Sequence, residues 1–185
     1  MLLSACQNIK KTPLVLFESL SFGMSPKSVE EVFGKVSEVE EEEETAYRDT
    51  WRAEDLYFYK TGRLFYHYEQ INLKGYPGRS TFTFSKSHRL EEATVHIPVA
   101  SKVEQKVVLN NLSQTVKKEL EELPDYQSMT TDTVGLYDDG YRYKVKLKGQ
   151  QRELWVDVYP TENKYATDTE TDKYTIRVDQ FLMYP

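Results

Sequence analysis

The sequence predicts an α+β fold made of two tandem modules, each a helix followed by an antiparallel sheet. Three observations lead to this prediction. A capped helix signal occurs near residue 26, and a second, longer one begins near residue 101. Each is followed by segments in which apolar and polar side chains alternate with the period of two that is typical of strands. Helices and strands grouped in this way favour helices packed on one face of an antiparallel sheet.

The predicted organisation has three parts. Residues 1–12 form a polar tether, residues 13–98 the first module, and residues 99–185 the second module. The two halves share the order of their elements but little sequence. This repetition favours a duplicated architecture.

The first helix is predicted over residues 25–34. Ser25 can accept a hydrogen bond from a free backbone amide, and Pro26 suits the first helical position because its missing N–H is not needed there. Gly34 supplies a left-handed stop. The run Glu38–Glu44 that follows is predicted to be a solvated loop, because like charges repel one another.

Strands then complete the first module. Lys60–Gly62 is predicted to turn one strand into the next, and Lys74–Gly78 to be a second turn. The predicted strands cover residues 45–51, 55–59, 63–73, 80–85 and 90–98.

The second module begins with a helix of about six turns that ends before Pro124. Ser101 and Glu104 are spaced as a capping box. Its apolar face is predicted to comprise Val103, Val107, Leu112, Val116, Leu120 and Leu123. The strands that follow are predicted over residues 141–149, 152–160 and 174–185.

Composition excludes some classes of function. The chain carries 24 basic and 30 acidic residues, a net charge of −6, which argues against a general nucleic-acid binder because phosphate contact needs a concentrated basic surface. No apolar run approaches the roughly 18 residues of a membrane-spanning helix. No esterase, phosphate-loop or metalloprotease motif occurs, and the spacing of His67, His88 and His96 does not require a metal site. We therefore expect a protein that is not an enzyme and needs no cofactor.

The only cysteine, Cys6, ends the string Leu3-Ser4-Ala5-Cys6, which resembles a bacterial lipobox. A secretory signal also needs a basic segment and roughly 7 to 15 apolar residues before the cleavage site, and only Met1–Leu3 precede it here. Two interpretations stay open: the tail of a longer precursor whose Cys6 is acylated, or a coincidence that leaves a free thiol. The first predicts a lipid anchor in the cell envelope, on the periplasmic side of an outer membrane if the cell has one.

The stretch around the first helix resembles the SmpA/OmlA (BamE) family of small outer-membrane lipoproteins and their β-lactamase-inhibitor-protein-like relatives. The matching residues are Gly23-Met24-Ser25, Val29, Phe33-Gly34, Leu56–Tyr59, Phe82–Ser85 and Leu90. The resemblance covers about residues 17–97, and Lys35 replaces the usual proline. It implies β-lactamase-inhibitor-protein-like modules and an anchor on the N-terminal cysteine, and it implies no catalytic residue.

Aromatic side chains in the predicted strands suggest a binding surface. Both faces of the hairpin at residues 55–68 carry large side chains, although helices need to cover only one face. The candidate partner-binding residues are Tyr57, Tyr59, Tyr66, Tyr68, Trp155 and Tyr159. In the alternative interpretation the tyrosines pack between the two halves.

The sequence therefore predicts a scaffold module that binds a protein partner in the envelope. The alternatives are an inhibitor of a secreted hydrolase and a small-ligand-binding accessory protein. An inhibitor would present a protruding loop, at Glu38–Glu44 or Gly75–Gly78, whereas an enzyme would have a concave site with converging ionisable groups.

Overall fold

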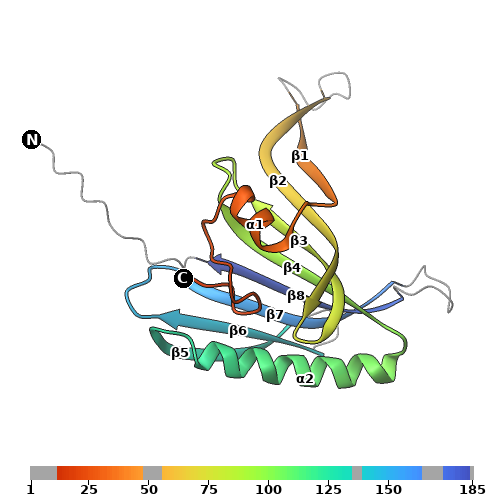
Figure 1. Ribbon diagram of the computed structural model, residues 1–185, viewed down its shortest axis with the longest axis vertical. Coiled ribbons are helices and arrows are strands. Elements are labelled where there is room, and N and C mark those ends of the chain that lie inside the picture. The colour runs from red at the N-terminus through yellow and green to blue at the C-terminus, as the bar shows by residue number, and fades with distance from the viewer. Residues whose placement is uncertain (1–11, 48–55, 135–138, 164–172, 184–185) are drawn as a thin grey trace, which may run out of the picture.

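A computed structural model describes residues 12–47, 56–134, 139–163 and 173–183 (Figure 1). At positions 45–47 and 56–59 it describes the backbone only. The two helices are α1 (Pro26–Phe33) and α2 (Lys102–Glu121). The eight strands are β1 (Glu38–Tyr47), β2 (Leu56–Leu73), β3 (Tyr76–Phe84), β4 (Leu90–Val99), β5 (Tyr126–Val134), β6 (Gly140–Leu147), β7 (Glu153–Glu162) and β8 (Tyr174–Met183).

All eight strands belong to one antiparallel sheet in the order β1-β2-β3-β4-β8-β7-β6-β5. The prediction of two tandem modules is therefore wrong. The order of elements does repeat, but β4 pairs with β8, with Val95 opposite Val178, so the sheet runs without interruption from one half of the chain into the other. Both strands carry apolar side chains on one face, and pairing them protects an edge that each four-stranded sheet would otherwise expose.

The helices and the N-terminal segment lie on one face of this sheet, which we call the core face. α2 packs against β4 to β8, and residues 12–24 with α1 pack over β2 to β4 (Figure 1). The rings of Phe17 and Phe33 contact Phe82 at centroid distances of 5.4 and 5.3 Å. The backbone N–H of Val15 donates to Gln180 Oε1 at 3.0 Å, which fixes the N-terminal segment to β8. One hydrophobic core therefore joins the two halves.

Both predicted helices form where their caps indicate. In α1, Ser25 Oγ accepts from the N–H of Ser28 at 3.2 Å, and Gly34 ends the helix at φ +82°. In α2, Ser101 Oγ accepts from the N–H of Glu104 at 3.2 Å, and the Glu104 carboxylate accepts from the N–H of Ala100 at 2.8 Å.

The predicted buried face of α2 is correct only in its C-terminal part. Leu112, Val116 and Leu120 are buried, whereas Val103 and Val107 are 76% and 54% exposed. At about 100° per residue, Val107 lies about 140° around the helix from Leu112, so the two cannot share a narrow face. The buried face instead continues through Leu109, Val108 and Gln105.

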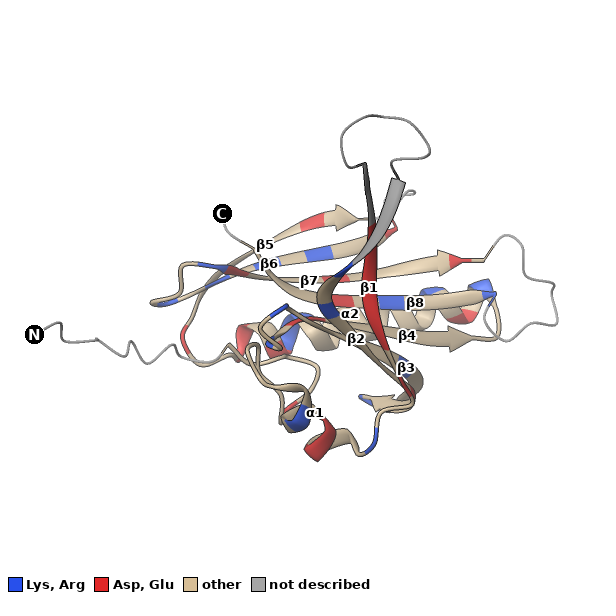
Figure 2. Ribbon diagram, turned by 90° about the horizontal axis from the view of Figure 1, so that it is seen from above, with Lys and Arg blue, Asp and Glu red and all other residues tan. Residues whose placement is uncertain are grey.

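The glutamate run Glu38–Glu44 is part of β1, so the predicted loop is wrong (Figure 2). Its partner β2 supplies cations: Lys60 Nζ lies 2.9 Å from Glu41 and Arg63 Nη1 lies 3.0 Å from Glu42. Alternate side chains of a strand also point to opposite faces, which weakens their mutual repulsion. The predicted turn at residues 60–62 lies within β2, and Gly62 has φ +79° where β2 bulges opposite residues 41–43 of β1.

Within the described ranges, neither helix has both the length and the apolar composition that a membrane span requires.

Candidate functional site

The face of the sheet opposite the core face, which we call the open face, is covered by neither α1 nor α2 (Figure 2). The strand register places one row of polar side chains across all eight strands of this face. In order from β1 to β5 the row contains Glu38, His67, Thr81, Thr94, Asp179, Asp157, Arg142 and Asp132. An alternation of apolar and polar residues on each strand thus produces a charged surface above a hydrophobic core.

At the β5–β7 end of the row the charges are paired. Asp157 is 4% exposed and accepts from Arg142 Nε at 2.7 Å and from Arg142 Nη2 at 2.5 Å, a bidentate pair. The Arg142 guanidinium and the Lys144 ammonium lie 4.9 and 4.8 Å from the ring of Trp155. Trp155 also contacts Phe181, with centroids 5.9 Å apart. This end of the open face is therefore partly aromatic, and its charged side chains are held by ion pairs and ring contacts.

In the middle of the row, Asp179 collects three hydrogen bonds. It accepts from Thr94 Oγ1 at 2.7 Å, from the Tyr159 hydroxyl at 2.8 Å and from Arg177 Nε at 2.9 Å. Burial, followed by the charge of Asp179, raises the pKa of Tyr159 and also raises the pKa of the neighbouring Glu92. The carboxylates of Glu92 and Asp179 thus lie close to each other in a partly buried part of the open face.

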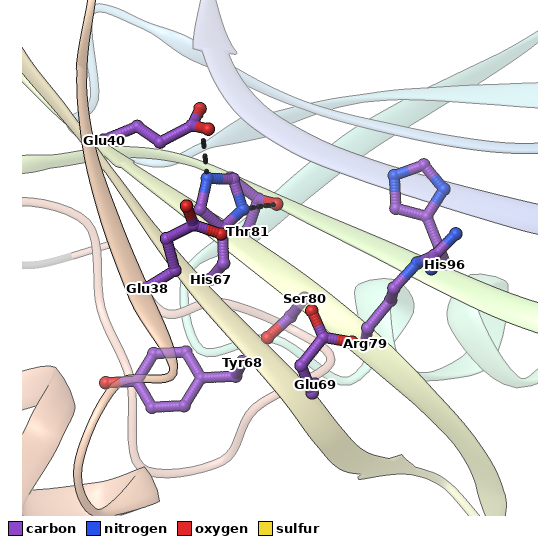
Figure 3. A pocket seen from close by; sticks show the side chains of 9 residues that line it. All are labelled: Glu38, Glu40, His67, Tyr68, Glu69, Arg79, Ser80, Thr81 and His96. Carbon is purple, nitrogen blue, oxygen red and sulfur yellow. Dashed lines mark hydrogen bonds and ion pairs between the residues drawn. The ribbon is translucent and has the colours of Figure 1, made fainter.

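At the β1–β4 end the open face contains a pocket of about 210 Å³ (Figure 3). His67 is held at its centre: its Nδ1 lies 3.0 Å from Thr81 Oγ1, and its Nε2 lies 3.5 Å from Glu40 Oε2. The Nε2 atom is buried and makes no hydrogen bond. The lining residues are Glu38, Glu40, His67, Tyr68, Glu69, Arg79, Ser80, Thr81 and His96.

The pocket is acidic on the side of β1. Glu38 and Glu40 come from β1 and Glu69 from β2, while Arg79 and His96 lie on β3 and β4 at the opposite side (Figure 3). Three carboxylates face one guanidinium, so an incoming positive charge finds more attraction than repulsion.

The series Thr81, His67 and Glu40 has the order of a nucleophile, a base and an acid, but its surroundings do not support acyl transfer. Thr81 lies in the middle of β3 and is paired with both β2 and β4. The backbone N–H groups around it are therefore used by the sheet and are not available as oxyanion donors.

The structure separates the residues that the sequence suggested as one aromatic surface. Tyr68 is 4% exposed on the core face, where its ring contacts Phe33 and Phe82, and Tyr66 lies beside it. Burial raises the pKa of Tyr68 to about 12. Trp155 and Tyr159 lie on the open face instead. The side chains of Tyr57 and Tyr59, and all of Cys6, lie outside the described residues.

The pocket residues were not predicted from the sequence, although one local signal was present. In Tyr66-His67-Tyr68 the period of two sends the histidine to the face opposite the two tyrosines. Its meeting with Thr81 and Glu40 depends on strand register, which the sequence does not specify. Within the described part of the chain, no group of three or more His, Cys, Asp or Glu side chains is arranged to hold a metal ion.

Comparison with known proteins identifies no relative. No protein-family model, curated protein or solved structure matches the chain.

Proposed function

We propose that the chain is a non-catalytic protein-binding module that receives a lysine or arginine side chain of its partner in the pocket on the open face. One observation carries this proposal: Glu38, Glu40 and Glu69 line a concavity of the uncovered sheet face together with His67. Glu40 is 60% exposed, so its charge is accessible to a partner.

The size of the open face favours a protein over a small molecule as the partner. His67 on β2 and Trp155 on β7 are separated by four strand spacings, and at about 4.8 Å per spacing this is roughly 19 Å. A partner that contacts both the acidic pocket and the aromatic end must cover an area typical of protein interfaces. Trp155 and Tyr159 thus keep the partner-binding role expected for them, whereas Tyr68 is too buried for it.

The alternative role as a hydrolase inhibitor receives less support. It called for a protruding loop at residues 38–44 or 75–78. The first segment is part of β1, and residues 76–78 begin β3.

Peptide selection tests the proposed binding mode. We would select peptides from a random display library against the wild-type chain and measure their affinities for Glu38→Gln combined with Glu40→Gln. We expect selected peptides to be rich in lysine and arginine, and their affinity to fall about tenfold in the double variant, because each lost ion pair contributes up to about 1 kcal/mol. The matched control is Glu91→Gln with Glu121→Gln, which removes two exposed carboxylates elsewhere. Peptides without basic residues, or an equal loss in the control, would contradict the proposal.

We also propose that the module is anchored in a bacterial envelope by acylation of Cys6, a proposal supported by the lipobox-like string alone. The full-length gene product should be expressed in a bacterium with and without Cys6→Ala. A mass increase matching acyl chains and recovery in the membrane fraction, both lost in the variant, are expected. An unmodified wild-type product would contradict anchoring and leave the binding proposal intact.

A further inference from the structure

A second concavity, of about 400 Å³, lies between the first half of α2 and the strands β5 to β7. It is on the core face, so it is separate from the pocket of the proposed function. Leu109, Tyr141 and Pro160 form apolar parts of its wall. Small-molecule sites typically have volumes of about 300–1,000 Å³ with apolar walls and a few fixed polar groups. We call this concavity the α2 cleft.

Gln105 provides the fixed polar group of the α2 cleft. It is 5% exposed, and its Nε2 donates to the carbonyl oxygens of Thr161 at 2.9 Å and Thr175 at 3.0 Å. Both amide hydrogens are therefore used by β7 and β8, which fixes the side chain. Among the described residues, no donor bonds to Gln105 Oε1. Because Gln105 lines the α2 cleft, this oxygen can accept a hydrogen bond from a ligand.

Charges at the α2 cleft favour an anionic group on that ligand. Lys106 is exposed and makes no ion pair within the described part of the chain. Lys102 has a long ion pair with Glu162, 3.8 Å between Nζ and Oε2. Asp139 is the one acid among the described lining residues, and Lys102 is already paired with Glu162, so Lys106 is the ammonium group left to meet an anion.

We propose that the α2 cleft binds a small, flat aromatic carboxylic acid that carries a hydroxyl or amino donor. Its ring packs against Leu109, Tyr141 and Pro160. Its donor bonds to Gln105 Oε1, and its carboxylate pairs with Lys106. The donor and the carboxylate lie at opposite ends of the ring system, because Gln105 is buried and Lys106 is exposed.

The test uses two probes that differ only in the hydrogen-bond donor, 6-hydroxy-2-naphthoate and 6-methoxy-2-naphthoate. Each is titrated into the full chain, and binding is followed by calorimetry and by amide NMR. We expect the hydroxy compound to bind with shifts at Leu109 and Gly140, and the methoxy compound to bind about fivefold or more weakly, since it cannot donate to Gln105. Lys106→Glu should weaken binding of the hydroxy compound about tenfold.

Lys117→Glu is the matched control, because it makes the same charge change at another exposed position of α2. It should leave binding unchanged. The proposal is overturned by no saturable binding up to about 5 mM, by shifts confined to other parts of the chain, or by equal effects of Lys106→Glu and Lys117→Glu. Equal affinities of the two probes would overturn the role of Gln105.

Discussion

Glu92 is a carboxylate in an unfavourable position on the open face. It lies on β4, between Thr83 of β3 and Phe181 of β8, close to the charge of Asp179. Burial, and then Asp179, raise its pKa above the usual 4.5. For an acid with a raised native pKa, the neutral form is favoured by folding. Its contribution to stability is therefore complete below pH 4.5 and is lost as the pH rises through the native pKa.

Glu92→Gln should consequently stabilise the chain at pH 7, because ionisation of the wild-type carboxylate is penalised in the native state and not in the unfolded state. The gain in unfolding free energy should shrink as the pH falls and vanish below about pH 4. Urea unfolding at a series of pH values measures it. Glu121→Gln, at an exposed position of α2, is the control and should show no such pH-dependent gain. A gain that does not depend on pH would assign the effect to packing.

Single residues could be predicted from the sequence where their role depends on near neighbours in the chain. Ser25, Gly34 and Ser101 act on groups no more than four residues away, so the helix caps were found. His67 and Thr81 are 14 residues apart and meet only through the register of β2 and β3. Register depends on how whole strands pair, and no local pattern specified it.

At the scale of elements, β1 is an edge strand that is dense in negative charge. It pairs with β2 on one side only, and Glu38, Val39 and Glu40 are all exposed. A free strand edge can pair with another molecule, and charged side chains prevent this. The same charges that suggested a loop in the sequence therefore protect a strand from self-association.

Replacing Glu38 and Glu40 with valine should increase self-association, because the edge then presents three consecutive valines with high strand propensity. Sedimentation velocity over a concentration series should show larger species for this variant than for the wild type. Glu91→Val with Glu121→Val removes the same charge from positions away from the edge and should behave like the wild type. Equal association of both variants would mean that the net charge of the chain, and not the charge on the edge of β1, prevents self-association.

At the scale of the whole molecule, the junction of β4 and β8 decides the architecture. A helix followed by antiparallel strands could be recognised in each half of the sequence, but β5 was not predicted, and neither was the pairing of strands across the two halves. The paired residues of β4 and β8 are far apart in the chain: Glu92 and Phe181 are separated by 89 positions, and Val99 and Tyr174 by 75. Val95, Val178 and Ile176 are buried together along this junction, and Gln180 ties the N-terminal segment to it.

A single sheet with one core should unfold as one cooperative unit, unlike two modules joined by a linker. Val178→Ala, at the junction, should lower the global unfolding free energy by about 2 kcal/mol. Native-state hydrogen exchange can follow amides of β3 in one half and of β7 in the other. Both sets should lose protection by the same amount, because both depend on the junction. If the substitution lowered protection in β7 and left β3 unchanged, the halves would be energetically independent despite the continuous sheet. An equal loss of protection in β3 and β7 would mean that the stability of both halves depends on the β4–β8 junction. The open face and the α2 cleft would then depend on this junction as well.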